Sequence, residues 1–203
     1  MGTERQSRRT FLVGAGASAV ALVGLTAGQT FDPLAPVNLF GPRVKGDGPQ
    51  GVPINRTAKQ AGVAGLAADP GWRLRVTSAR DAIELSREDL ERMPQAEAVL
   101  PIACVEGWST TAHWRGVPLG DLLALAGTNP EHTVRVVSLQ PRGAYRETTM
   151  PPHYAWDPLT LVALELNGQT LDADHGYPAR IIAPGRPGVL QTKWLSAIRE
   201  ESA

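Results

Sequence analysis

Hydrophobic and polar positions divide the chain beyond about residue 70 into short strands and a few short helices. Residues 72–77 (Trp-Arg-Leu-Arg-Val-Thr) alternate apolar and polar side chains, which predicts a strand with one buried face. Apolar runs of strand length predict further strands at 98–105, 133–139, 161–166, 169–171, 179–183 and 193–198.

Capping residues, prolines and glycines mark the ends of two helices and one tight turn. Ser86 and Asp89 form a capping-box pattern that predicts a helix ending at Met93, before Pro94. Residues 118–126 have helical spacing and end at Gly127. Asn167-Gly168 between two apolar runs predicts a hairpin with a type I′ turn. The fold class expected is α+β, a mixed and mostly β-sheet domain with a few short helices.

The first 30 residues have the form of an export signal. A basic start ending in Arg8-Arg9 is followed by an uncharged stretch of small residues from 11 to 27. The arginine pair before Phe11-Leu12 resembles a twin-arginine signal, which carries folded proteins to an extracytoplasmic location. An uncleaved membrane anchor at 11–27 and a buried N-terminal helix remain alternatives.

Two further regions follow the signal or anchor at 1–30. Residues 31–65 are rich in proline and glycine, which predicts an extended linker. Residues 66–203 form the predicted folded domain, and no internal repeat is apparent.

Composition narrows the class of function. The 203-residue chain balances 20 Lys+Arg against 20 Asp+Glu, so no electrostatic footprint for nucleic acid is expected. A single cysteine excludes an intrachain disulfide, and the four histidines lack the spacing of zinc ligands.

Two clusters of residues are candidates for chemistry. Cys104 lies where an apolar strand meets the loop 105–109, a place suited to a thiolate ligand for a soft metal, although a cysteine there is often an inert core residue. Residues 174–194 bring together one histidine, two arginines and one lysine among glycines and prolines. Such a block suits a phosphate group, and a solvated basic loop is the alternative.

Four motifs occur in an order that resembles the molybdopterin-binding domain of the sulfite oxidase family. They are Cys-Val-Glu-Gly-Trp-Ser at 104–109, Leu-Glu-Leu-Asn-Gly at 164–168, Asp-His-Gly-Tyr-Pro-Ala-Arg at 174–180, and Pro-Gly-x-x-Gly at 184–188 with Lys193-Trp194. The resemblance covers about residues 50–200. It is strongest to bacterial exported members, including the catalytic subunit of the periplasmic methionine sulfoxide reductase system.

The resemblance implies a molybdenum–molybdopterin cofactor and a role for each matching residue. Cys104 would be the metal's protein ligand and the catalytic residue. Cofactor-binding residues implied with it are Asn55, Ser138, His175, Arg180, Gln191, Thr192 and Lys193. The substrate pocket would include Glu106, Trp108 and His113.

Two departures from the family bear on the substrate. Leu164 stands where animal and plant sulfite oxidases have an active-site tyrosine, and Glu106-Gly107-Trp108 replaces their arginine-bearing loop. Reduction of an S-oxide or N-oxide therefore fits better than oxidation of sulfite. The expected partners are a small-molecule oxo substrate and a membrane-bound haem or quinone-linked electron-transfer protein, and the domain is expected to be a monomer.

Two other functions stay open at this point. One is a non-catalytic, membrane-tethered molybdopterin-binding module. The other is a thiol enzyme in which His113 activates Cys104, but it leaves the 174–194 block unexplained.

Overall fold

The computed structural model describes residues 13–16, 18, 48–104 and 108–201. The chain divides into two units, Met1–Arg43 and Val44–Ala203. In the first unit residues 13–16 are helical and exposed, and most of the predicted signal or anchor lies outside the described residues. In the described part of the chain, no helix combines the length and apolar character needed to span a membrane.

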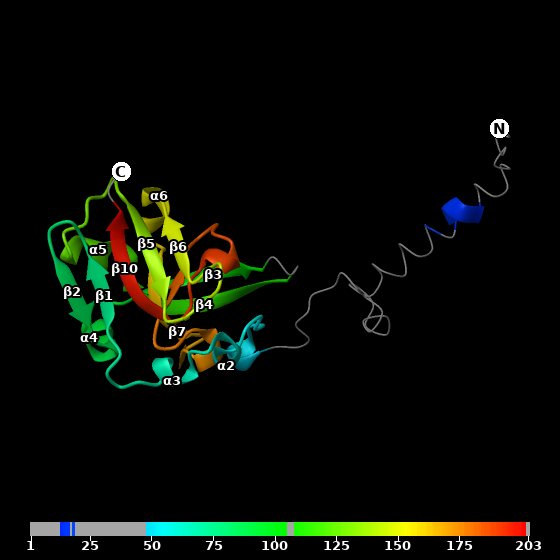
Figure 1. Cartoon of the computed structure of the whole chain (residues 1–203), viewed down its shortest axis with the longest axis horizontal. Helices are drawn as coiled ribbons and strands as arrows, with labels where there is room; N and C mark the ends of the chain where they lie inside the picture. The colour runs from blue at the N-terminus through cyan, green and yellow to red at the C-terminus, as the bar shows by residue number, and fades with distance from the viewer. Residues whose placement is uncertain (1–12, 17, 19–47, 105–107, 202–203) are drawn as a thin grey trace. The chain divides into compact units, whose positions relative to one another are not determined.

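Five strands of the second unit form one mixed sheet. They are β1 (Leu74–Thr77), β2 (Ala82–Leu85), β5 (Thr133–Ser138), β6 (Glu147–Met150) and β10 (Leu195–Glu201). Their order is β2–β1–β10–β5–β6, so the last strand of the chain lies in the middle of the sheet (Figure 1). The pair β1–β10 is parallel, with Val76 opposite Ile198, and the other pairs are antiparallel.

The second sheet is antiparallel and carries the long hairpin that ends beside Cys104. Its strands are β3 (Ala96–Ala103), β4 (Ser109–Pro118), β7 (Leu161–Leu166), β8 (Gln169–Thr170) and β9 (Arg180–Ile182). The path runs β3–β4–β7–β8, with β9 on the other edge of β7. Strand alternation turns Leu100 and Ile102 toward a buried cluster around Trp114, whereas Val99 faces solvent.

Short helices complete the second unit. The α-helices are α2 (Ala58–Ala61), α3 (Ala64–Ala67), α4 (Arg87–Arg92), α5 (Leu119–Leu125) and α6 (Pro152–Ala155), and the 3₁₀ turns are η2 (Pro49–Gly51), η3 (Ala173–His175) and η4 (Gly188–Leu190). The capping box of α4 is present, with Ser86 accepting from the backbone of Asp89 and the Asp89 carboxylate accepting in return.

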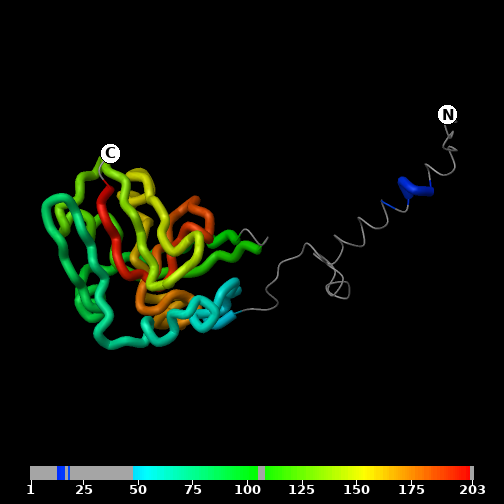
Figure 2. Tube along the Cα trace, in the orientation of Figure 1, coloured from blue at the N-terminus to red at the C-terminus, as the bar shows by residue number. Residues whose placement is uncertain are grey.

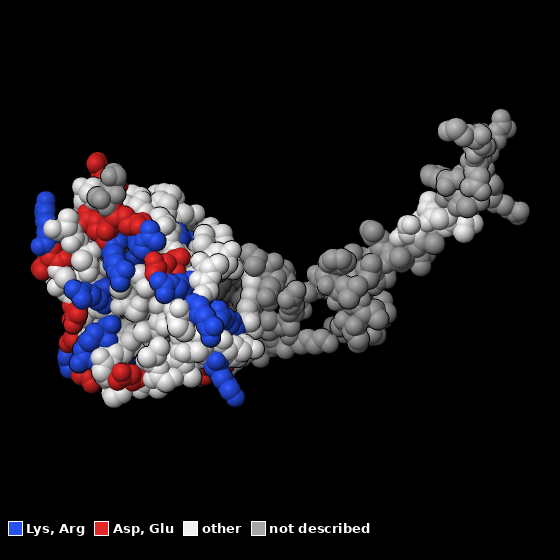
Figure 3. All heavy atoms as spheres, in the orientation of Figure 1, with Lys and Arg blue, Asp and Glu red and all other residues white. Residues whose placement is uncertain are grey.

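The main hydrophobic core joins the two sheets. Leu74 and Val136 of the first sheet belong to the same buried cluster as Val162 and Leu164 of the second, with Leu122 of α5. The Cα trace follows both layers in Figure 2, and Figure 3 shows acidic and basic side chains interspersed over the visible described face. This interspersion agrees with the zero net charge of the sequence.

The predicted fold class is confirmed, and most predicted elements are observed within a few residues. The hairpin turn is also confirmed, because Asn167 and Gly168 both have positive φ, at 50° and 76°. Strands β2, β4 and β6 were not predicted. The domain begins earlier than residue 66, because Ala58, Ala61 and Val63 are buried against Trp194. Helices of four residues leave no periodic signal in a proline-rich stretch, which is why residues 48–65 were expected to be a linker.

Candidate functional site

A cavity of about 220 Å³ opens at the end of strand β3. Five segments far apart in the sequence form its walls. The residues that line it are Val52, Pro53, Ile54, Asn55, Arg56, Ile102, Cys104, Trp108, Gln140, Gly143, Ala144, Tyr145, His175, Arg180, Gly188, Val189, Gln191, Thr192, Lys193 and Trp194. These segments are residues 52–56, the end of β3 with the residues after it, the loop after β5, the turn that leads into β9, and η4 with residues 191–194. The cavity therefore exists only in the folded chain.

Cys104 lies on one wall, directly after β3, and is partly buried. Its backbone N–H donates to the carbonyl of Trp108 at 2.8 Å, which continues the pairing of β3 with β4 by one position. The side-chain amide of Asn55 donates to Sγ of Cys104 and accepts from Nε1 of Trp108 at 2.8 Å. The sulfur is therefore held in one orientation toward the cavity by a residue from a distant segment.

Gly188 brings η4 against the backbone that precedes Cys104. A Cβ at position 188 would lie 2.6 Å from the carbonyl oxygen of Ala103, closer than real Cβ contacts. Only glycine allows this approach, so η4 forms the cavity wall next to the thiol.

Arg180 supplies a buried positive charge beneath the cavity. Its guanidinium donates to the carbonyls of His175 at 3.0 Å and Gln191 at 3.4 Å and lies over the ring of Trp114. Burial lowers its pKa to about 10, which leaves it protonated at neutral pH. Among the described residues no ion pair involves Arg180, so the buried charge fits an anionic ligand in the cavity.

Lys193 and His175 lie beside this charge. Nζ of Lys193 donates to the carbonyls of Arg56 at 2.7 Å and Asp174 at 2.8 Å. Burial, and then the charge of Arg180, lower the pKa of Lys193 to about 7. Burial likewise lowers the pKa of His175 to about 4, so its imidazole is neutral at neutral pH and Nε2 donates to the carbonyl of Pro49 at 2.6 Å. An anion in the cavity would favour the protonated form of Lys193.

Gln191 and Thr192 complete the lining of the cavity. Nε2 of Gln191 donates to Arg186 and Ala183, whereas its buried Oε1 has no partner among the described residues. A buried acceptor of this kind needs a donor, and a heterocycle bearing N–H groups would supply one. The donor set therefore fits a pterin with a phosphate, with the thiol of Cys104 available to a soft metal.

The structure brings most of the residues predicted from sequence to this cavity. Asn55, Cys104, Trp108, His175, Arg180, Gln191, Thr192 and Lys193 all line it. Ser138 does not line it but donates from Oγ to the carbonyl of Lys193 at 2.8 Å, so its contribution is to hold the Lys193 backbone. Glu106 lies outside the described residues.

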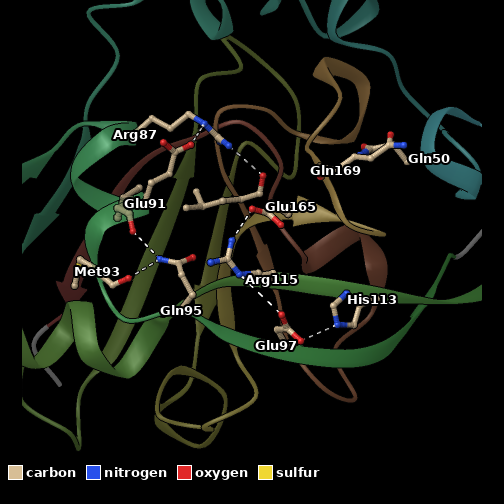
Figure 4. Close-up of polar contacts among 12 residues, drawn as sticks. Gln50, Arg87, Glu91, Met93, Gln95, Glu97, His113, Arg115, Glu165 and Gln169 are labelled. Atoms are coloured by element: carbon tan, nitrogen blue, oxygen red, sulfur yellow. Dashed lines mark hydrogen bonds and ion pairs between the residues drawn. The ribbon is translucent and has the colours of Figure 1, made fainter.

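His113 does not line the cavity. It lies on β4 opposite Val99, and its Nε2 is 3.3 Å from Glu97 on the outer face, in the polar row that continues to Arg115 and Glu165 (Figure 4). Its neighbours Ala112 and Trp114 point inward, and side chains alternate along a strand, so His113 must point outward. Its predicted place in the substrate pocket is therefore corrected.

Among the cavity residues that were missed in the sequence, three have polar side chains that could reach a ligand. Arg56 and Gln140 contact each other through a 2.8 Å hydrogen bond, and Tyr145, with about half of its surface exposed, lies on the same loop as Gln140. The only local signal was the turn composition of Pro141–Gly143 after the apolar run 133–139, which marks a loop without showing what the loop faces.

In this mixed α+β domain one thiol, a buried arginine and a partly buried lysine line the same cavity, an arrangement suited to a cofactor-binding oxidoreductase domain. The family model described as "Oxidoreductase molybdopterin binding domain" matches residues 60–202. The chain belongs to this family, whose members of the sulfite oxidase type are molybdopterin-dependent oxidoreductases.

Individual relatives agree with this assignment. The chain is 33% identical over 178 residues to mitochondrial sulfite oxidase of Rattus norvegicus, covering 74% of this chain and 32% of that protein. It is 31% identical over 144 residues to the protein-methionine-sulfoxide reductase catalytic subunit MsrP of Gluconobacter oxydans, covering 63% of this chain and 46% of MsrP. The crystal structure of sulfane dehydrogenase SoxCD from Paracoccus pantotrophus superimposes with a TM-score of 0.58 at 25% identity, covering 64% of this chain and 38% of that one. The chain therefore spans less than half the length of these relatives.

Proposed function

We propose that this chain is the catalytic domain of a molybdenum–molybdopterin oxidoreductase that transfers an oxygen atom, with the Cys104 thiolate as the metal's protein ligand. The observation that carries the proposal is the position of Sγ of Cys104 in the same cavity as the buried Arg180. When bound, the cofactor supplies the two-electron redox chemistry and the oxygen-atom exchange.

The chain's own residues bind and orient this group. Arg180 and Lys193 provide positive charge for the phosphate. Gln191 offers to a pterin N–H its Oε1, which has no partner within the described part of the chain. Asn55 holds the sulfur of Cys104 toward the cavity by its hydrogen bond. His175 is neutral at neutral pH, and its Nε2 donates to the carbonyl of Pro49. This bond joins the turn that carries His175 to the segment that precedes Asn55.

Reduction of an S-oxide or N-oxide is the reaction direction that we propose for this site. Leu164 is 2% exposed, belongs to the main core and does not line the cavity. The position that bears a tyrosine in animal and plant sulfite oxidases therefore offers no hydroxyl to a substrate. The relative named as a methionine-sulfoxide reductase catalytic subunit supports the same direction.

The proposal includes an extracytoplasmic location and an external electron donor. The Arg8-Arg9 pattern supports export of the folded, cofactor-loaded chain by the twin-arginine route. A membrane-bound haem or quinone-linked protein would deliver the electrons. A relative named as the putative protein-methionine-sulfoxide reductase subunit YedZ1, 32% identical over 111 residues, supports such an arrangement.

Metal and pterin analysis tests this function directly. The full chain, produced in a host with an intact cofactor pathway, should contain molybdenum and pterin near one equivalent each. Cys104→Ala should retain much of the pterin, because the phosphate contacts remain, and should lose activity with S-oxides and N-oxides. Absence of both molybdenum and pterin from the wild-type chain would reject the proposal. The thiol-enzyme alternative is less favoured, because His113 does not line the cavity with Cys104.

A further inference from the structure

Residues 48–57, called the strap here, form one wall of the cavity and precede α2. Their middle carries Asn55, whose side chain reaches Cys104, and Val52, which is buried beside the β3–β4 hairpin. The strap has no strand partner, so side-chain hydrogen bonds and the burial of Val52 decide where it lies. Besides the bonds of Asn55, hydrogen bonds attach both of its ends.

Gln50 makes the bonds at the first end. Its Nε2 lies 3.1 Å from the carbonyl of Leu166, 3.3 Å from that of Gln169 and 3.1 Å from that of Thr170. Its Oε1 accepts from the backbone N–H of Asp172 at 2.9 Å. One side chain thus satisfies backbone groups on both sides of the β7–β8 hairpin, and Figure 4 shows it lying against Gln169.

The backbone at Gln50 is also fixed by the hairpin. Its carbonyl accepts from Nδ2 of Asn167 at 2.7 Å, and its φ of 59° lies in the left-handed region that disfavours residues with a Cβ. The hydrogen bonds to the hairpin hold this conformation in place. Gln50 does not line the cavity, so these bonds serve the strap and not a ligand.

The second end of the strap is attached to the turn that carries His175. The backbone N–H of Ala58 donates to Oδ1 of Asp174 at 2.7 Å, and Lys193 donates to the carbonyl of Arg56. Asn55 lies between the two attachments. If the side-chain bonds of Gln50 are lost, the first end keeps the bonds that Asn167 donates to the Gln50 carbonyl and His175 donates to the Pro49 carbonyl. Asn55 is then held less firmly from this side, and the wall beside Cys104 can move away from the cavity.

We propose that Gln50 is a positioning residue. Its side-chain hydrogen bonds attach the strap to the β7–β8 hairpin, and this attachment holds Asn55 against Cys104 and closes the cavity wall. The inference rests on the proposed function only in taking the cavity as the cofactor site. When the hydrogen bonds of Gln50 break and the strap moves away, Cys104 and the cavity become exposed together. When the bonds form again, the bound group is retained.

The decisive variant is Gln50→Asn. Asparagine tolerates the left-handed conformation, so the backbone is not strained, but its amide is one methylene too short to reach the same carbonyls. Gln95→Asn is the matched control, because Nε2 of Gln95 also donates to two carbonyls, those of Leu90 at 2.8 Å and Met93 at 2.9 Å, at a site away from the strap (Figure 4).

Alkylation provides the readout, because Cys104 is the single cysteine of the chain. The full chain is produced without cofactor and treated with iodoacetamide at one fixed pH, and modification is followed by mass spectrometry. Gln50→Asn should react about tenfold faster than wild type, the change in open population expected when one net hydrogen bond is lost. Gln95→Asn should react within about twofold of wild type, because its loss does not release the strap.

Cofactor retention gives a second readout on the loaded chain. Gln50→Asn should release pterin several times faster than wild type during dilution, while Gln95→Asn keeps the wild-type rate. Equal alkylation rates in Gln50→Asn and wild type would overturn the inference, and so would equal acceleration by Gln95→Asn at the same loss of thermal stability. If the wild-type chain never contains molybdenum or pterin, the proposed function fails, yet the alkylation comparison still decides the role of Gln50.

Discussion

Asn55 and Cys104 lie 49 positions apart in the sequence, and the amide of Asn55 donates a hydrogen bond to the Cys104 sulfur. The same amide accepts from the indole of Trp108, the residue before β4. One side chain therefore fixes both the thiol and the aromatic ring beside it. Four predictions follow from this site: the first two concern cofactor binding, and the last two concern the stability of the chain.

Replacement of Asn55 should weaken binding of the metal without unfolding the chain. Asn55→Ala removes the donor to the thiolate, and Asn55→Asp also places a negative charge beside it. Hydrogen bonds to charged groups contribute about 1.5–3 kcal/mol, so molybdenum affinity should fall roughly ten- to hundredfold for Asn55→Ala and further for Asn55→Asp. Metal content after purification, with Asn129→Asp as a surface control for the charge change, measures the effect. Equal molybdenum content in all four proteins would contradict the assignment.

Arg180 and Arg186 offer a matched pair of buried arginines. Both donate to backbone carbonyls, but Arg180 lines the cavity and Arg186 does not. Arg180→Lys loses the planar fork and should lower cofactor content at least about tenfold. Arg186→Lys should keep the cofactor and lose about 1–2 kcal/mol of stability through its bonds to Leu190 and Thr149. The contrast is read from pterin content and from urea unfolding, and a cofactor loss in Arg186→Lys equal to that in Arg180→Lys would refute it.

His175 should make the stability of the cofactor-free chain depend on pH. Burial lowers its pKa from 6.5 to about 4, so between these values the unfolded chain binds more protons than the folded chain. Stability should therefore fall as the pH decreases from 6.5 to 4, by up to about 3 kcal/mol. His175→Gln, which can still donate to the Pro49 carbonyl, should show a flatter profile. Urea denaturation at a series of pH values measures this difference, and parallel profiles for both proteins would show that His175 is not the cause.

Gly188→Ala should destabilise the wall beside Cys104. The added Cβ meets the carbonyl of Ala103 at 2.6 Å, and overpacking against backbone costs about 1–3 kcal/mol. Gly65→Ala is the control, because it lies in α3 with open space around it and should be neutral or stabilising by about 0.5–1 kcal/mol. Thermal unfolding of both variants gives the sign of each change. A neutral Gly188→Ala would mean that η4 can move away from Cys104 without cost.

Local patterns predicted those parts of the fold that depend on neighbouring residues. The alternation at 72–77, the capping box at Ser86 and the Asn167-Gly168 turn each predicted an element that the structure contains. Strand β4 was missed, because Ser109–His113 is polar enough to be taken for a loop and becomes a strand by pairing with β3. Tertiary pairing overrides a weak local preference there.

The candidate site shows the same division between local and tertiary information. The residues of the 174–194 block and Cys104 were identified from motifs, since their types and order are written in the chain. His113 was misplaced, because its side of the strand depends on the register with Val99, and residues 48–65 were taken for a linker. Arg56 and Gln140 gave no signal, because their contact joins positions 84 residues apart.

The sequence by itself determined which chemical groups this protein possesses: one thiol, a cationic block and a glycine that permits close approach. The tertiary structure decided how these groups face one another. It buried Arg180 among the described residues without an ion pair, brought Asn55 to Cys104, and attached the strap through Gln50 to the β7–β8 hairpin. Such relationships depend on packing and hydrogen bonding between distant segments, and no local pattern of residues records the distances between them.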